Sequence, residues 1–141
     1  MEIRRKNTSV EELNSLSKNT MVEHLGIRLT RIEDNLLEGE MPVDHRTHQV
    51  FGILHGGASV VLAETLGSIG AQLYAPDTHQ CMGLDINANH IRAVKSGKVI
   101  GRAVPIHLGR TTQVWEIKIT TEDEKLVCIS RLTVAVVPKQ K

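Results

Sequence analysis

The chain has 141 residues and a mass of 15.6 kDa, which is the size of one domain. Its 17 Lys and Arg residues almost balance its 16 Asp and Glu residues, and the formal charge of +1 excludes a global electrostatic attraction to nucleic acid or to an anionic membrane. A hydrophobic content of 40% excludes a disordered chain, and a single Trp, Tyr and Phe disfavour an aromatic platform for single-stranded nucleic acid. We therefore expect one domain over residues 1–141, with neither nucleic acid nor a membrane as partner.

Targeting signals and paired cysteines do not stand out in the sequence. Residues 1–20 are polar and lack the apolar core of a signal peptide, and no run approaches the roughly 18 apolar residues of a membrane-spanning helix. A cytoplasmic location is expected. Cys81 and Cys128 are far apart and in no paired motif, which favours small apolar filler over a disulfide or a cysteine zinc site.

The first elements are short. Two capping boxes, each a Ser or Thr followed three residues later by Glu, predict short helices over residues 8–25. The first begins at either Thr8 or Ser9, and the second begins at Thr20. Residues 27–32 and 36–43 are typical of two strands joined by the turn-forming sequence Glu-Asp-Asn.

Residues 56–75 are a nearly continuous run of small and aliphatic residues that stops at Pro76. The run predicts the only long helix of the chain, about 30 Å long. Its apolar residues are distributed nearly all around the helix axis, which indicates a helix that is covered by protein on most sides. Gly67 and Gly70 each cost about 1 kcal/mol relative to Ala inside a helix, so they indicate that another element passes close by.

Four stretches rich in β-branched residues follow the helix, with turn-forming sequences between them. They are residues 82–94, 98–108, 112–121 and 126–137. Because three strand-turn-strand passages occur without an intervening helix, the sheet is predicted to be antiparallel. The expected fold class is α+β, with an antiparallel sheet of five to six strands wrapped around one long central helix.

Glu64 is the one charged residue between Gly57 and Pro76. A carboxylate in an apolar, buried helix is costly unless it has a partner, and such groups are typical places for acid–base chemistry. The alternative is that Glu64 lies on the one strip of the helix that faces solvent.

The sequence His55-Gly56-Gly57 marks the start of the helix. The first N–H groups of a helix have no partner within it, and glycine lets a ligand approach them closely. A thioester carbonyl placed there could rest its developing oxyanion on the Gly56 N–H. Simple turn and cap chemistry explains the same sequence without any ligand.

The spacing of Gly56 and Glu64 has a geometric consequence. The two residues are eight positions apart, about 12 Å along a helix axis, whereas a nucleophile or base must lie near 3 Å from the atom on which it acts. If they share one site, they must come from different chains, so the active form is at least a dimer. Ser68 lies one turn after Glu64 on the same face and could orient the carboxylate or a water molecule.

Gln49, His-Gly-Gly at residues 55–57, Glu64 and Ser68 resemble the hot-dog-fold acyl-CoA thioesterases of the phenylacetate-operon and 4-hydroxybenzoyl-CoA group. Longer stretches are similar to the bacterial subgroup that contains the 1,4-dihydroxy-2-naphthoyl-CoA hydrolase of menaquinone biosynthesis and the enterobactin proofreading thioesterase. These stretches are MPVDHRT from Met41, FGILHGGASVVLAET from Phe51, LDINANHIR from Leu84, HLGR from His107 and SRLTVAV from Ser130. The similarity extends from Thr8 to Val137.

The resemblance implies a hot-dog fold, a homo-oligomer that is usually a tetramer built as a dimer of dimers, and thioester hydrolysis without metal or cofactor. It implies that Glu64 is the catalytic carboxylate, either as nucleophile or as general base on water, and that Gly56 supplies the oxyanion N–H. Gln49 and His55 would help to position the reacting groups, and Ser68, a position that varies between Ser and Thr, would assist.

Further residues are assigned by the resemblance to binding of the substrate, chiefly its coenzyme A portion. They are Gly57, Gly83, His90, Ile91, Arg92, Ala93, His107, Leu108, Gly109, Arg110, Thr111 and Thr112. Arg92, His107 and Arg110, together with Lys95, supply positive charge near strand ends that suits the phosphates of coenzyme A, although solvated turn charges would look the same.

Three functions follow from these observations. The first is a thioesterase for coenzyme A or for acyl or aryl carrier protein thioesters, with an aromatic acyl group such as 1,4-dihydroxy-2-naphthoyl or hydroxybenzoyl favoured. The second is a non-catalytic hot-dog module that binds acyl-CoA. The third is a hot-dog dehydratase, which fits less well because His55 lies directly before Gly56. Neither a His-Glu-x-x-His metal motif nor a Gly-x-Ser-x-Gly nucleophile motif occurs.

Overall fold

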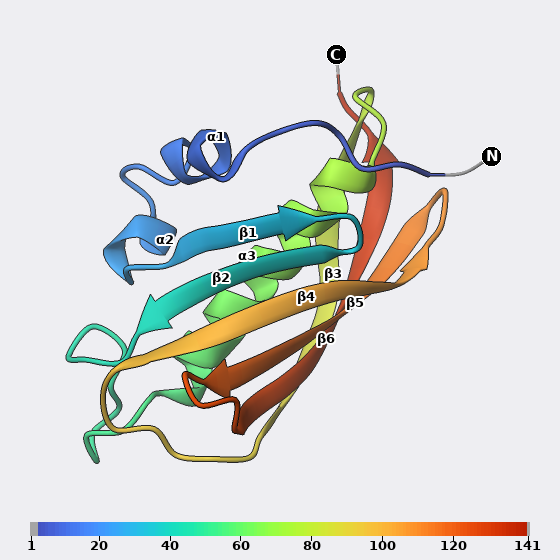
Figure 1. Cartoon of the computed structure of the whole chain (residues 1–141). Coiled ribbons are helices and arrows are strands. Elements are labelled where there is room, and N and C mark those ends of the chain that lie inside the picture. The colour runs from blue at the N-terminus through green and yellow to red at the C-terminus, as the bar shows by residue number, and fades with distance from the viewer. Residues whose placement is uncertain (1–2, 141) are drawn as a thin grey trace.

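The structure is a computed structural model and describes residues 3–140. Three helices lie in this part of the chain, and Figure 1 shows the two short ones, α1 and α2, beside the first strands. Their bounds are α1 Val10–Ser15, α2 Met21–His24 and α3 Gly56–Tyr74. The Ser9 side chain accepts a hydrogen bond from the Glu12 N–H, which confirms the first predicted cap.

The described strands form one antiparallel sheet that curves around α3 (Figure 1), in the order β1-β2-β4-β5-β6-β3. Their bounds are β1 Arg28–Glu33, β2 Leu36–Pro42, β3 His79–His90, β4 Lys98–Leu108, β5 Thr112–Thr121 and β6 Leu126–Pro138. The predicted fold class, a sheet wrapped around one long helix, is confirmed.

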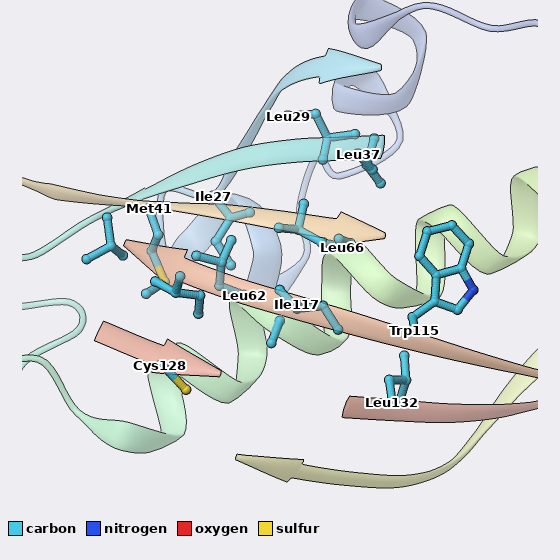
Figure 2. Packing of buried hydrophobic residues seen from close by; sticks show 14 of the residues in the cluster. Ile27, Leu29, Leu37, Met41, Leu62, Leu66, Trp115, Ile117, Cys128 and Leu132 are labelled. Atoms are coloured by element: carbon cyan, nitrogen blue, oxygen red, sulfur yellow. The ribbon is translucent and has the colours of Figure 1, made fainter. Parts of the chain in front are cut away.

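The core lies between α3 and the concave face of the sheet (Figure 2), where Leu62 and Leu66 are fully buried. The two helix glycines permit this approach. A Cβ atom at Gly67 would lie 2.7 Å from Cδ2 of Leu132, and one at Gly70 would lie 2.8 Å from Cη2 of Trp115. The close passage predicted from these glycines is therefore present.

The third strand differs from the prediction at both ends. It begins at His79 rather than at residue 82, directly after a turn in which the His79 N–H donates to the Pro76 carbonyl. It ends at His90 rather than at residue 94, because Ile91 and Arg92 both direct their N–H groups to the Val127 carbonyl and leave the ladder. The residues that follow form a loop that is important for the site.

The two edges of the sheet differ in how they are protected. At the β1 edge, Asn14 of α1 donates from Nδ2 to the Leu29 carbonyl at 3.0 Å and accepts from the Leu29 N–H at 2.9 Å, as a neighbouring strand would. This edge strand has 6 residues and a register shift after Leu29, whereas β3 has 12 residues. Within residues 3–140 nothing pairs with the outer edge of β3. An unpaired edge of that length is a surface for strand addition.

Candidate functional site

The N-terminus of α3 presents a free hydrogen-bond donor. His55 is the N-cap, and its Nδ1 accepts from the Gly57 N–H at 2.7 Å. The Ala58 and Ser59 N–H groups donate to the His55 carbonyl. The Gly56 N–H donates to no protein acceptor in the described part of the chain. Because its neighbours are satisfied, Gly56 is the donor left for a ligand oxygen, at the positive end of the helix dipole.

The acceptor role of His55 fixes the proton on its ring. A neutral imidazole that accepts at Nδ1 carries its hydrogen on Nε2. The His55 side chain is exposed, so this Nε2–H is available to solvent or to a ligand. His55 therefore both holds the first turn of α3 and adds a second donor to the same end of the helix.

The loop after β3 lies against this helix end. A cavity of about 220 Å³ is lined by Ile53, Leu54, Gly56, Ser59, His90, Ile91, Arg92, Ala93 and Val127. The His90 ring contacts Gly56 so closely that a Cβ atom at Gly56 would lie 2.9 Å from its Nε2. The fold thus brings together the Gly56 N–H and the segment 90–93, both of which the family resemblance assigns to the site. The Arg92 guanidinium supplies positive charge beside the cavity.

The loop between β2 and α3 is held in place by polar contacts. Asp44 pairs with Arg46 at 2.8 Å, and the hydrogen bonds from Arg46 lower the Asp44 pKa to about 2. Further along, His48 Nε2 lies 2.9 Å from the Lys95 carbonyl, and the Leu54 N–H donates to the Val94 carbonyl at 2.8 Å. These contacts join the two loops that form the site.

Gln49 lies in a tight turn just before the helix. Its N–H donates to the Ile53 carbonyl at 2.9 Å, its carbonyl accepts from the Gly52 N–H at 3.0 Å, and its Oε1 accepts from the Phe51 N–H. Its Nε2 has no acceptor among residues 3–140. The turn therefore fixes the carboxamide and leaves its two N–H donors for another group.

Glu64 lies on an uncovered strip of α3 rather than in the core. Its side chain is exposed, and the carboxylate makes no hydrogen bond or ion pair with any residue from 3 to 140. The strip consists of the partly or fully exposed residues Gly57, Val60, Val61, Glu64, Thr65, Ser68, Ile69 and Gln72. Ser68 is half-buried and is not hydrogen-bonded to Glu64. In one copy the apolar helix is thus covered on its other faces only.

The segment 107–112 lies at the opposite end of the molecule. It forms the turn between β4 and β5, which Figure 1 shows near the C-terminal end of α3. The His107 ring lies over Gly109, where a Cβ atom would be 2.5 Å from its Nε2. Arg110 is exposed at the tip of this turn.

A second cavity of about 810 Å³ begins at this turn. Its lining is Ile3, Arg4, Lys6, Tyr74, Ala75, Pro76, Asp77, His79, Gly109, Arg110, Gln113 and Val136. The N-terminal segment is fixed there because the Lys6 N–H donates to the Leu73 carbonyl at 2.8 Å and Lys6 Nζ lies 3.1 Å from Asp77. Lys6 and His79 line this cavity and are not among the predicted site residues. The basic run Arg4-Arg5-Lys6 was the available signal, but nothing in the sequence placed it beside residue 110.

The predicted site residues therefore fall into groups that one copy does not unite. Gln49, His55, Gly56 and the segment 90–93 lie together at the start of α3, and Glu64 lies two turns further along the helix. Gly83 is on exposed β3, where a Cβ atom would meet only Leu132 Cδ1, at 4.0 Å. Neither cavity described above includes Gly83 in its lining.

No group of three or more His, Cys, Asp or Glu side chains from residues 3–140 is arranged to hold a metal ion. None of the helices in that range combines the length and the apolar character that crossing a membrane requires.

Comparison with known proteins identifies the class of this fold and site. The structure of thioesterase HI1161 from Haemophilus influenzae superposes with a TM-score of 0.95 at 51% identity, covering 99% of this chain and 98% of the other. A variant of thioesterase PA1618 from Pseudomonas aeruginosa superposes with a TM-score of 0.94 at 50% identity, covering 98% and 100%. The fold is the hot-dog fold of thioesterases.

The sequence comparisons agree with the structural ones. The pattern of the Thioesterase superfamily matches residues 51–128. The proofreading thioesterase EntH from Cronobacter turicensis is 52% identical over 132 residues, which is 94% of this chain and 96% of that protein. The chain belongs to the Thioesterase superfamily and is a thioester hydrolase. The predicted family, fold and enzyme class are therefore confirmed.

Proposed function

We propose that the protein hydrolyses acyl-CoA thioesters, preferably of aromatic acids such as 1,4-dihydroxy-2-naphthoic or hydroxybenzoic acid, in a site shared by two copies of the chain. The proposal is supported by two groups on one helix that have no partner within the described chain, a hydrogen-bond donor and a carboxylate. The Gly56 N–H and the Glu64 side chain both lack partners among residues 3–140, and they lie about 12 Å apart along one helix. A second copy supplies the missing half of each site.

In this mechanism the thioester carbonyl oxygen accepts a hydrogen bond from the Gly56 N–H. Glu64 of the neighbouring copy attacks the carbonyl carbon or removes a proton from an attacking water molecule. The new C–O bond places negative charge on the carbonyl oxygen, where the helix N-terminus stabilises it. In the general-base route the C–S bond then breaks, the acid is released, and the proton that Glu64 took from water passes to the leaving thiolate. In the nucleophile route C–S cleavage leaves a mixed anhydride between the acyl group and Glu64, a water molecule hydrolyses it to the acid and free Glu64, and a proton from that water protonates the thiolate.

The neighbouring donors have roles that their hydrogen bonds suggest. The Gln49 carboxamide, fixed by the Phe51 N–H, and the His55 Nε2–H, fixed by the Gly57 N–H, can orient the carbonyl or the carboxylate. Ser68 follows Glu64 by one helical turn and can hold the attacking water. These three residues act on position and charge rather than as nucleophiles.

Two surfaces support pairing of two copies. The outer edge of β3 is long and unpaired and carries exposed Met82 and Leu84, whereas Asn14 closes the β1 edge. The uncovered strip of α3 also includes apolar side chains. A two-fold axis beside β3 would join the sheets and bring the two α3 strips together, which buries both surfaces at once.

The same pairing would give coenzyme A a path across both copies. In an antiparallel β3 pair, the His79 end of one strand lies beside the His90 end of the other. The cavity that contains Lys6, His79 and Arg110 would then continue the cleft at the partner's Arg92. Lys6, Arg110 and the partner's Arg92 can there bind the phosphates by charge-assisted hydrogen bonds.

The proposal includes a larger assembly and a location. A dimer of dimers is expected, and an acyl or aryl carrier protein can present the same thioester in place of coenzyme A. The free thiols of Cys81 and Cys128 are consistent with the cytoplasm, where thiols stay reduced.

The experiment is a thiol-release assay with benzoyl-CoA, 1,4-dihydroxy-2-naphthoyl-CoA and hexanoyl-CoA, together with the oligomeric state from light scattering. The proposal expects thiol release from all three, with the highest kcat/KM for an aromatic ester, by an oligomer. Binding of the esters without thiol release, or full activity in a monomer, would contradict it.

A further inference from the structure

A side chain of α3 occupies the first part of the β3 edge. Gln72 donates from Nε2 to the His79 carbonyl at 3.2 Å, and its Oε1 accepts from the Cys81 N–H at 3.0 Å. The His79 N–H is also used, because it donates to the Pro76 carbonyl at 2.9 Å. Backbone groups that already have partners offer no template for another strand. Although no strand of the described chain covers this edge, the edge is therefore closed as far as Cys81.

The free part of the edge extends from Gly83 to His90. Beyond His90 the backbone turns to the Val127 carbonyl and leaves the ladder. Two copies of one segment that pair antiparallel overlap fully only when the two-fold axis passes through the middle of that segment. For this segment the middle residue is Ile86 or Asn87.

The shared site places the axis independently of the strand edge. This step rests on the proposed function, in which Gly56 of one copy faces the partner's Glu64. A two-fold axis that exchanges the two equivalent contacts passes beside Val60, which is midway between these residues in the sequence. The position of Val60 along β3 therefore indicates which strand residue lies at the axis.

The way in which α3 lies along β3 gives this position. The helix runs antiparallel to the strand, because Gly56 contacts the His90 ring and Gln72 bonds to the other end of β3. The axis lies one quarter of the way along this stretch of the helix, so it lies about one quarter of the way along the strand, at residue 87 or 88. Asn87 is the residue on which the strand edge and the shared site agree.

The side chains on the convex face of β3 match this register. The His90 ring points to α3 on the concave face. The alternate residues Asp85, Asn87 and Asn89 therefore point to the convex face, where all three are exposed. With the axis at Asn87, the two Asn87 carboxamides lie side by side, and each Asp85 carboxylate lies opposite the partner's Asn89 amide. A shift of the axis by one residue toward Gly83 would leave Asn89 opposite Gly83, which has no side chain to bond.

We propose that Gln72 is a positioning residue of the shared site: it closes the start of the β3 edge, so that two copies pair only through the segment that follows, with Asn87 on the two-fold axis. The smallest change of register moves the partner by two residues, about 7 Å along the strand. A reacting carboxylate must lie near 3 Å from its target, so such a shift separates the two halves of the site. Gln72 thus holds the partner's Glu64 opposite Gly56.

Disulfide cross-linking tests the register, in a chain that carries Cys81→Ser and keeps the buried Cys128. Residues that face each other across an antiparallel pair have Cα atoms about 4.5–5.5 Å apart, which a disulfide can bridge. We expect Asn87→Cys in this chain to form a covalent dimer when it is oxidised with copper phenanthroline. Asn89→Cys is the matched control and should form none, because the two copies of residue 89 would lie about 13 Å apart.

The role of Gln72 is tested by Gln72→Met, which keeps the length of the side chain but removes its N–H donors and its strong acceptor. We expect the cross-linked fraction of the isolated Asn87→Cys oligomer to fall below about half of its value with Gln72. Without the cysteine changes, kcat for benzoyl-CoA should fall about tenfold while KM changes less. Gln80→Met is the control, because the Gln80 side chain is on the same strand and makes no hydrogen bond within residues 3–140.

The other outcomes separate this inference from the proposed function. An active oligomer without a covalent Asn87→Cys dimer would overturn the register while the thioesterase proposal stands. Unchanged cross-linking and kcat in Gln72→Met would overturn the role of Gln72. If Gln72→Met dissociates, Gln72→Glu decides, because it keeps the acceptor for the Cys81 N–H and should give values between those of Gln72→Met and the wild type. A wild type that is monomeric, or that releases no thiol, would overturn the proposed shared site instead.

Discussion

The two faces of α3 have different tasks. On one face Leu62, Leu66, Gly67 and Gly70 are buried against the sheet, where side-chain size is set to within a methyl group. On the other face Glu64 is exposed in a single copy and has no partner among residues 3–140. The first face therefore specifies the fold, and the second face is the one that a second copy and a substrate would cover under the proposed function.

The largest expected effect belongs to the uncovered face. Glu64→Gln removes the carboxylate but keeps the shape, so we expect kcat to fall by about a thousandfold or more while the free energy of unfolding stays nearly unchanged. The matched control is Glu122→Gln, an exposed residue in the β5–β6 turn, which should retain wild-type kcat. Turnover of Glu64→Gln at the wild-type rate would remove Glu64 from the mechanism.

On the buried face we expect a loss of stability. Leu66 is fully buried between the helix and the sheet (Figure 2), so Leu66→Ala should lower the free energy of unfolding by about 2–5 kcal/mol. Urea denaturation of both proteins measures this difference. Ile69→Ala, on the uncovered strip, is the comparison and should cost less in the same measurement. Equal losses for the two variants would mean that the faces do not differ as described.

A smaller effect tests the close helix–sheet approach. The Cβ atom in Gly70→Ala would meet the indole of Trp115 at 2.8 Å, and the rigid ring cannot move aside easily. We expect Gly70→Ala to destabilise the protein by about 1–3 kcal/mol, even though Ala is the better helix former. Gly83→Ala is the control for stability, because its Cβ would meet only Leu132, at 4.0 Å. A Gly70→Ala protein that is more stable than the wild type would show that α3 packs less closely against Trp115 than described.

The smallest effect concerns the thiol of Cys128, which packs in the same core. Burial raises the Cys128 pKa above its usual value of about 8.5. The folded state therefore favours the neutral thiol, a contribution that is complete below the unfolded pKa and is lost as the pH rises through the folded pKa. Stability measured between pH 7 and pH 10 should fall slightly more for the wild type than for Cys128→Ala. Identical pH dependences would contradict a buried thiol.

Much of the fold was predictable because local patterns determine it. The bounds of β4 and β5 were predicted to the residue, since β-branched residues and turn sequences mark their ends. The ends of β3 were not, because the ladder stops at His90 only where Val127 accepts two N–H groups, a contact between distant segments. The order of the strands also depends on such contacts, and so do the hydrogen bonds of the Asn14 side chain to the edge strand β1.

The sequence predicted which residue types belong to the candidate site. It did not predict which of them one copy brings together. The His55 cap and the free Gly56 N–H could be predicted because helix-start chemistry is local. The position of segment 90–93 beside them is a contact between distant segments, which only the family resemblance implied. The exposed position of Glu64 was the alternative that the sequence left open, since a strip covered by another copy has the same composition as one covered by its own sheet. Lys6 is near Arg110 only because the chain folds back over α3.

The central claim is that one site uses Gly56 of one copy and Glu64 of another. It is tested most directly by co-producing two inactive chains, Glu64→Gln and Gly56→Pro, with different tags, and isolating the mixed oligomer. Proline is accepted at the first position of a helix but lacks the N–H, so Gly56→Pro removes the oxyanion donor. Gly56→Ala keeps the N–H and is its control, because both variants place a Cβ atom 2.9 Å from His90 Nε2. A mixed dimer then contains one site with both groups intact. We predict that the isolated mixed dimer regains about half of the wild-type kcat, whereas a mixed dimer as inactive as its two parents would contradict the claim.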